Sequence, residues 1–415
     1  MDSARRLIES VFSKPSVFKN KEALYPEYVP SILPHREEQI KQLAEIFKPL
    51  VTSPGSISQR AVLVGGVGTG KTVTARAFGR ELRALARNLG LDLRYVHINC
   101  HRDRTLFEVV TEITRQLGAP IPSRGLSAQE IFVALLNFMD REDIYAIITL
   151  DEFDYLVNVA GSDAIYFLVR IYDEYPEKIK RVNYILITRD ISALRRLDPA
   201  TESYILKHVV RFNQYSSIEL FDILKARRAE AFHEGTVSDD VLRYIAEYEG
   251  IDKGGDGNAR AALEILLLAG EAADHEYSDR VSIEHVRKAL SLVNPDIVVV
   301  NDLLIYLHVH ELLLLKAAIR LLRRSGNMFA RIGDVEREYI QLCEELGEKP
   351  RKHTQIYEYV TNLKKMGIIQ ARVSGKGFKG RSTLIGIGIG PLESLEKKID
   401  DILTNVIGKK HGSTS

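Results

Sequence analysis

The segment GGVGTGKT, from Gly65 to Thr72, has the residue types and the spacing that suit phosphate binding. Its glycines let successive backbone N–H groups surround an anion, where a side chain would block the approach. In such a loop Lys71 reaches the β- and γ-phosphates of a nucleoside triphosphate, and the Thr72 hydroxyl holds Mg²⁺. We predict these nucleotide-binding residues: Gly65, Gly66, Val67, Gly68, Thr69, Gly70, Lys71, Thr72 and Val73.

Two carboxylates follow a second apolar run further along the chain, in IITLDEFD. Asp151 is suited to hold a Mg²⁺-coordinated water, and Glu152 to orient or deprotonate the attacking water. An acidic pair at a strand end is by itself ordinary, but downstream of a phosphate-binding loop it predicts an ATPase centre. We therefore expect Lys71, Asp151 and Glu152 to be catalytic, Thr72 and Asp151 to bind metal, and ATP or ADP with Mg²⁺ to be the cofactors.

Short apolar runs that alternate with helical patterns must position these motifs. Such alternation is typical of a parallel sheet covered by helices on both faces. After about residue 215 the strand signals stop and helical patterns follow, and from about residue 300 helices precede two strand-like runs around a glycine-rich loop. The predicted strands are Ala61–Val64, Leu93–Asn99, Tyr145–Leu150 and Val182–Thr188, with the later pair at Ile368–Val373 and Thr383–Ile389.

Composition places few limits on the partners of the chain. The 415 residues suggest two or three domains, and 57 basic against 56 acidic residues leave a net charge of +1, so any nucleic-acid surface must be local. Cys100 and Cys343 match no metal-ligand spacing, and we expect both to be buried. No signal peptide and no membrane span is predicted, which favours a cytoplasmic, nucleoid-associated protein without a membrane partner.

A local basic surface is predicted near the C-terminus, where Lys349–Arg381 holds nine Lys or Arg residues against one acid, Glu358. Helices followed by two strands make a winged helix, a fold that binds duplex DNA but also proteins. A basic loop with one apolar residue suits insertion beside phosphates, and the helix before it has a polar face for a major groove. The predicted DNA contacts are Lys376, Phe378, Lys379 and Arg381 in the loop, with Thr354, Gln355 and Tyr357 on the helix.

These motifs, taken in order, resemble the archaeal initiator family related to the eukaryotic origin recognition complex and its cell-division-control loader (Orc/Cdc). The resemblance covers nearly the whole chain and includes YVPSILPHREEQI, RFNQYSSIELFDILKARR and GNARAALEILLLAGEAA. It implies an α/β P-loop AAA+ core (parallel sheet, helices on both faces) with a helical lid domain and a C-terminal winged-helix domain. The expected boundaries are 1–215, 216–298 and 299–403, with a disordered tail at 404–415.

The same resemblance implies further site residues and partners. Val29, His35 and Arg36 would help to enclose the base, and Tyr215, Arg227 and Arg260 would lie near the nucleotide. Arg102 and Arg104, in a helical insertion of the core, would contact DNA. The implied partners are double-stranded origin DNA, an MCM-type replicative helicase and paralogous initiator subunits.

Two positions depart from the family's pattern. Arg189 stands where the sensor strand usually ends in asparagine, and Ala200 stands where an arginine usually serves the ATP of a neighbouring subunit. An absent arginine finger removes up to ~10³–10⁵ in rate, so we expect slow hydrolysis and a divergent paralogue. The alternatives are an AAA+ DNA motor such as a branch-migration helicase, which Ala200 disfavours, and a signalling ATPase with a protein-binding winged helix, which the basic loop disfavours.

Overall fold

A computed structural model describes residues 16–293, 304–373, 383–387 and 392–411. The chain divides into two compact units. The sheet unit comprises Tyr25–Arg227 and Glu249–Ala261. The helical unit comprises Met1–Leu24, Arg228–Tyr248 and Ala262–Ser415.

The sheet unit is built on five parallel strands in the order β2-β3-β4-β1-β5. The four strands predicted in this part of the chain are confirmed, within a residue at each end. The fifth, β5, was not predicted, because its four residues VVRF include a charge and give no clear alternation. The strands are β1 (Arg60–Gly65), β2 (Asp92–Asn99), β3 (Ile144–Asp151), β4 (Val182–Thr188) and β5 (Val209–Phe212).

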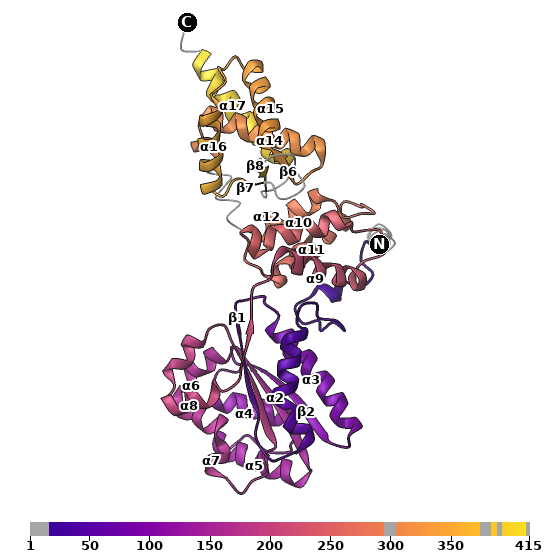
Figure 1. Cartoon of the computed structure of the whole chain (residues 1–415), viewed down its shortest axis with the longest axis vertical. Coiled ribbons are helices and arrows are strands. Elements are labelled where there is room, and N and C mark those ends of the chain that lie inside the picture. The colour runs from indigo at the N-terminus through magenta and orange to yellow at the C-terminus, as the bar shows by residue number, and fades with distance from the viewer. Residues whose placement is uncertain (1–15, 294–303, 374–382, 388–391, 412–415) are drawn as a thin grey trace, which may run out of the picture. The chain divides into compact units, whose positions relative to one another are not determined.

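Helices cover both faces of this sheet because alternate strand residues point to opposite sides (Figure 1). In β1, Val62 and Val64 belong to the core that contains α4, α5 and α6, whereas Ala61 and Leu63 belong to the core that contains α2 and α3. The predicted doubly covered sheet is therefore confirmed. Its helices are α2 (Glu37–Thr52), α3 (Lys71–Asn88), α4 (Leu106–Gln116), α5 (Ala128–Arg141), α6 (Phe153–Val169), α7 (Ile171–Glu174), η2 (Ile191–Arg196), α8 (Pro199–Ile205) and η3 (Ile251–Lys253).

A set of helices with no strand between them follows β5, as the sequence predicts. The glycine-rich segment DKGGDGN lies between two of these helices. Three of them, α9, α10 and α11, each run across a boundary between the two units. Their bounds, with those of one N-terminal turn, are η1 (Lys21–Leu24), α9 (Ser217–Ala231), α10 (Asp239–Glu249), α11 (Ala259–His275) and α12 (Ile283–Val293).

The C-terminal part of the helical unit is a winged helix, in which helices α14 to α17 pack together with a small antiparallel sheet of order β6-β8-β7 that lies at one end of them (Figure 1). Strand β6 was not predicted, because three residues are too few for a periodic signal. Helix α17 extends through residue 411, although the sequence predicts a disordered tail from residue 404; Leu395, Ile399 and Leu403 recur at helical spacing and pack on the core. The predicted domain boundaries stay predictions. The elements are η4 (Leu304–Tyr306), α14 (Val309–Ser325), β6 (Phe329–Arg331), α15 (Ile332–Glu345), α16 (His353–Lys365), β7 (Gln370–Val373), β8 (Thr383–Gly386) and α17 (Leu392–His411).

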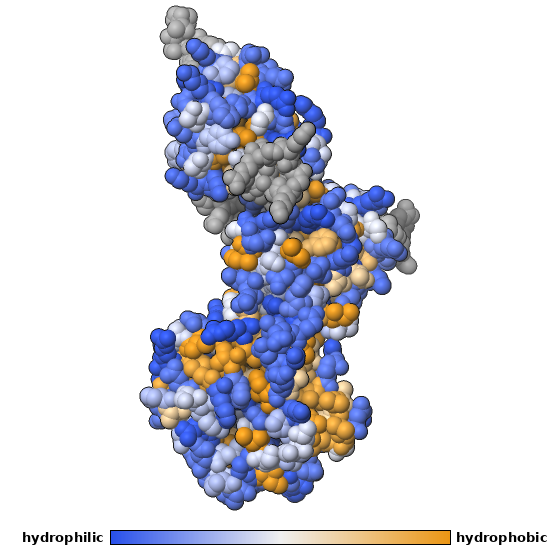
Figure 2. Space-filling view, viewed as in Figure 1, coloured by the Kyte–Doolittle hydropathy of each residue, from blue (hydrophilic) through white to orange (hydrophobic). Residues whose placement is uncertain are grey.

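The molecular surface in view is mostly hydrophilic, and its larger apolar areas lie on the sheet unit (Figure 2). Within the described ranges, no helix combines the length and the apolar character that crossing a membrane requires. Cys100 and Cys343 are both buried, as predicted, and burial raises the pKa of each thiol.

Candidate nucleotide site and DNA-binding elements

The phosphate-binding loop connects β1 to the first turn of α3 and depends on two glycines with positive φ. Gly68 has φ 71° and Gly70, the residue before α3, has φ 86°. A Cβ on Gly68 would lie 1.6 Å from Oδ1 of Asn258, and a Cβ on Gly70 would lie 2.7 Å from the hydroxyl of Tyr215. Both the backbone conformation and the close neighbours therefore require glycine here.

Lys71 lies inside this loop. Its Nζ donates to the carbonyl oxygens of Gly65 and Gly66, at 2.6 Å in each case, and the residue is only 9% exposed. Burial lowers the pKa of Lys71, and the negative charge of Asp151 acts in the opposite direction. The ammonium group is thus held at the start of α3, where the helix N-terminus favours an anion.

Asp151, the last residue of β3, faces the start of α3. The Thr72 hydroxyl donates to its Oδ2 at 2.7 Å, and Nε2 of His97 lies 3.4 Å from the same oxygen. Burial disfavours the charged carboxylate, but hydrogen bonds from His97 and Thr72 outweigh this effect, so the pKa of Asp151 is lowered. A hydroxyl and an ionised carboxylate in contact are hard oxygen donors, which fits Mg²⁺.

His97 was missed by the sequence reasoning. It lies on β2, beside β3, and its Nδ1 is 3.4 Å from the hydroxyl of Tyr95. Thr149 donates to that hydroxyl at 2.9 Å. A line of polar side chains therefore leads from Thr149 to Asp151 and orients the carboxylate. The strand DLRYVHIN also holds Asp92, Arg94 and Asn99, so no signal in the sequence distinguishes His97 from its polar neighbours.

Glu152 directly follows Asp151 and has a left-handed backbone, with φ 56° and ψ 43°. Its N–H donates to Oδ1 of Asp151 at 3.0 Å, which fixes this turn. A non-glycine residue in this conformation stores roughly 1–3 kcal/mol of strain, and such strain is concentrated at functional sites. The turn carries the Glu152 carboxylate to the edge of the sheet, where Arg189 donates to it at 3.2 Å.

Arg36 joins the segment before the loop to the loop itself. Its guanidinium donates twice to the carbonyl of Thr69, at 2.8 and 3.1 Å, and lies 3.9 Å from the ring centre of Tyr215. Burial is the largest influence on Arg36 and lowers its pKa. Tyr215 is 3% exposed and its backbone N–H donates to Gly257. The structure therefore brings two of the predicted nucleotide-binding residues, Arg36 and Tyr215, to the P-loop.

The segment before Arg36, which holds the predicted residues Val29 and His35, contacts α9, which holds the predicted residue Arg227. His35 Nε2 lies 2.8 Å from Oδ2 of Asp222. Arg227 is buried, with its guanidinium 5.0 Å from the ring of Tyr28. Val29 is half-buried in the same segment. Contact of these residues with a nucleotide stays a prediction.

Arg260 is exposed in the first turn of α11, directly after residues that touch the loop. The N–H of Ala259 donates to the carbonyl of Gly68 at 3.1 Å. Asn258 caps the helix, because its side-chain oxygen accepts from the N–H groups of Arg260 and Ala261. Asn258 was not predicted as a site residue, although an asparagine before a helical run signals a cap.

The helix predicted for a major groove, α16, has the expected division between its two faces. Ile356, Val360 and Leu363 are buried in the winged-helix core. The exposed face carries the predicted contacts Thr354, Gln355 and Tyr357. The predicted contacts in the loop, Lys376, Phe378, Lys379 and Arg381, lie outside the described residues.

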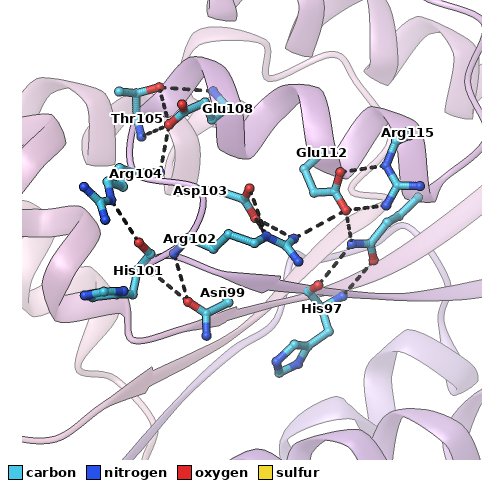
Figure 3. A network of polar contacts seen from close by, with 11 residues as sticks. His97, Asn99, His101, Arg102, Asp103, Arg104, Thr105, Glu108, Glu112 and Arg115 are labelled. Atoms are coloured by element: carbon cyan, nitrogen blue, oxygen red, sulfur yellow. Dashed lines mark hydrogen bonds and ion pairs between the residues drawn. The ribbon is translucent and has the colours of Figure 1, made fainter. Parts of the chain in front are cut away.

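Arg102 and Arg104 lie in the turn between β2 and α4 (Figure 3). Arg102 donates to Asp103 at 2.8 Å and lies 3.7 Å from Glu112, so two carboxylates balance its charge. Arg104 donates to the carbonyl of His101 and makes no ion pair with any residue in the described ranges. The structure thus brings both arginines to one exposed turn, and Arg104 has the less compensated charge.

Protein-family models match three successive parts of the chain. An AAA domain matches residues 58–197, a Cdc6 AAA+ ATPase-type lid domain matches 221–291, and a CDC6 C-terminal winged helix domain matches 302–397. The order of the three is the order that the motifs predict.

Curated relatives match along almost their full length. The chain is 46% identical over 412 residues to "ORC1-type DNA replication protein 2" of Sulfolobus acidocaldarius, which covers 99% of the chain and 98% of the relative. It is 33% identical to "ORC1-type DNA replication protein" of Pyrococcus horikoshii, over 93% and 91% respectively.

Solved structures with the same fold include Cdc6p of Pyrobaculum aerophilum, at a TM-score of 0.79 and 32% identity, covering 94% of this chain and 100% of that one. The Aeropyrum pernix ORC2 protein, in ADPNP and ADP complexes, matches at 0.64 and 27%, over 95% and 100%. The Aeropyrum pernix ORC1 protein in complex with DNA matches at 0.61 and 29%, over 94% and 98%.

Proposed function

Because the chain belongs to the Cdc6/Orc1-type family of AAA+ replication initiators, we propose that it is a nucleotide-controlled initiator: it binds ATP or ADP with Mg²⁺, binds origin duplex DNA, and helps to recruit or load the replicative helicase. The observation that carries this proposal is the coexistence in one chain of a formed P-loop site and an α16 helix with an exposed polar face.

At the nucleotide site, each residue has a role that follows from its position. Lys71 exchanges its two carbonyl partners for phosphate oxygens, and the glycine loop donates backbone N–H groups to the same anion. A bound Mg²⁺ would neutralise phosphate charge. Thr72 and Asp151 are the residues that would hold it. Glu152 accepts the proton of the attacking water.

The base end of the nucleotide would lie near Arg36 and Tyr215, which pack on each other and on the loop. The proposed further contacts are Val29, His35, Arg227 and Arg260. A relative supports nucleotide binding in general, because an Aeropyrum ORC2 structure is described as containing ADPNP and ADP.

Hydrolysis is proposed to be slow. Ala200 lies in the first turn of α8, where its N–H donates to Asp198. Its methyl group carries no charge that could stabilise the ATP of a neighbouring subunit. Without such a finger, up to ~10³–10⁵ of rate is lost. Bound nucleotide therefore acts mainly by setting the conformation of the protein, and less by driving repeated cycles of hydrolysis.

DNA contacts are proposed for three places: Thr354, Gln355 and Tyr357 on α16; Lys376, Phe378, Lys379 and Arg381 after β7; and Arg102 and Arg104 before α4. An Aeropyrum ORC1 structure, 29% identical, is described as a complex with DNA. The proposed protein partners are an MCM-type helicase and paralogous initiator subunits.

Duplex-binding titrations at several salt concentrations test the DNA assignment. Replacing Lys376, Lys379 and Arg381 together by alanine should weaken binding and reduce the salt slope by about one unit for each phosphate that the variant no longer neutralises. Lys397→Ala, which removes one exposed positive charge from α17, is the control and should leave the slope close to that of the wild type. A wild-type slope in the triple variant would exclude that loop as a DNA-binding element. Branched-DNA preference over origin duplex would favour the motor instead.

A further inference from the structure

Arg189 directly follows the strand that lies between the P-loop strand and the Asp151 strand. β4 pairs with β1 on one side and with β3 on the other, and Arg189 is the first residue after it. Its Nη2 donates to Oε1 of Glu152 at 3.2 Å. The positive charge of Arg189 also acts on Lys71, whose pKa it helps to lower. Arg189 therefore contacts Glu152 and lies close enough to Lys71 for the two positive charges to interact.

Only the side-chain torsions of Glu152 can redirect its carboxylate. Its backbone is fixed by the left-handed turn and by the hydrogen bond to Asp151. Of the side chains in the described ranges, Arg189 is the one that hydrogen-bonds this carboxylate. The Arg189 side chain is 61% exposed and that of Glu152 is 32% exposed, so solvent reaches the pair. An exposed pair of this kind is weak enough to exchange partners.

We infer that Arg189 is a positioning residue that restrains Glu152, and that the γ-phosphate of a bound nucleoside triphosphate weakens this restraint without removing it. This inference rests on the proposed function and explains part of its slow hydrolysis. The γ-phosphate carries more negative charge than a carboxylate and competes for the guanidinium, whereas ADP has no γ-phosphate. In the free and ADP-bound protein the carboxylate stays paired with Arg189.

The restrained step is ordinary hydrolysis. The water oxygen forms a bond to the γ-phosphorus while the bond to the β–γ bridging oxygen breaks, and ADP leaves with that electron pair. The water proton passes to the Glu152 carboxylate. A carboxylate whose oxygen accepts a hydrogen bond from Arg189 is less available for that proton, so the ion pair slows this step.

Single-turnover hydrolysis with saturating ATP measures the restraint. Arg189→Ala should raise the rate by up to about five-fold, the factor that corresponds to the upper end of ~0.2–1 kcal/mol for an exposed pair. Arg189→Asn should raise it similarly. Arg195→Ala is the matched control, because it removes an exposed arginine from the next element, η2, and should leave the rate unchanged. A lower rate in Arg189→Ala would overturn the inference, because the guanidinium would then be assisting the phosphate.

Nucleotide affinity gives a second readout that is independent of turnover. With a non-hydrolysable triphosphate analogue, Glu152→Gln should tighten binding several-fold more when Arg189 is present than in the Arg189→Ala background, because the competing carboxylate has lost its charge. ADP affinity should show no such coupling. Equal effects in both backgrounds would overturn the inference.

Failure of this inference and failure of the proposed function have different signatures. If wild-type protein binds nucleotide and Lys71→Ala does not, the assignment of the nucleotide site stands, whatever rates and affinities the Arg189 variants show. If Lys71→Ala retains tight ADP binding, the site assignment fails first, and the Arg189 measurements are then evidence against the inference as well.

Discussion

Replacing Gly68 by alanine should damage the packing between the P-loop and the start of α11, with a size that follows from the geometry. An alanine at φ 71° costs about 1–2 kcal/mol, because the left-handed conformation strains any residue with a Cβ. The new Cβ would also lie 1.6 Å from Oδ1 of Asn258, so that side chain must move. Asn258 then no longer caps α11, which removes about 0.5–2 kcal/mol of local stability.

Amide hydrogen exchange over the first turn of α11 measures this destabilisation directly. In Gly68→Ala the amides of Arg260 and Ala261, which donate to Asn258 in the wild type, should exchange roughly two- to thirty-fold faster, the range that ~0.5–2 kcal/mol implies. Gly90→Ala is the matched control, because Gly90 has φ 77° but no atom within 4 Å of its Cβ. It should leave the two amides unchanged. Unchanged exchange in Gly68→Ala would refute the proposed coupling between the loop and α11.

The remaining predictions concern the nucleotide site and the buried carboxyl of Glu249. Lys71→Ala should abolish ADP and ATP binding in calorimetry, because a buried ammonium at the loop is removed; retained tight binding would contradict the site assignment. Glu152→Gln should bind ATP normally but hydrolyse it at least ~10²-fold more slowly in a phosphate-release assay, the lower range for removal of a general base, and unchanged turnover would move that role to another residue. Burial raises the pKa of Glu249 to about 7, and Asp256 adds to this effect, so the folded state favours the protonated form. Stability from this group is therefore present at low pH and lost as pH rises towards 7, and Glu249→Gln should remove that loss in unfolding measured from pH 5 to 8; an unaltered pH profile would argue against it.

The strands and the phosphate loop could be predicted from sequence because their signals are local. Alternate residues of β1 belong to two cores, so Ala61–Val64 is apolar throughout, and GGVGTGKT follows it directly. The inward and outward faces of α16 were also predictable, since Ile356, Val360 and Leu363 recur at helical spacing.

Contacts between distant segments could not be predicted in this way. Asn258 reaches Gly68 across almost two hundred positions of chain, and the Arg189–Glu152 pair depends on strand order, which places β4 between β1 and β3. His97 could be recognised only once β2 was known to lie beside β3. Arg36 was expected near the nucleotide from family resemblance, but its packing on Tyr215 needed the folded chain.

The central claim is that this chain binds discrete origin sites under nucleotide control, and footprinting across candidate origins of the source genome tests it most directly. With wild-type protein, we expect protection of discrete duplex sites whose extent changes between ATP and its absence. In Lys71→Ala the protection should not respond to ATP. Uniform or junction-specific protection, or wild-type footprints that ignore nucleotide, would contradict the account.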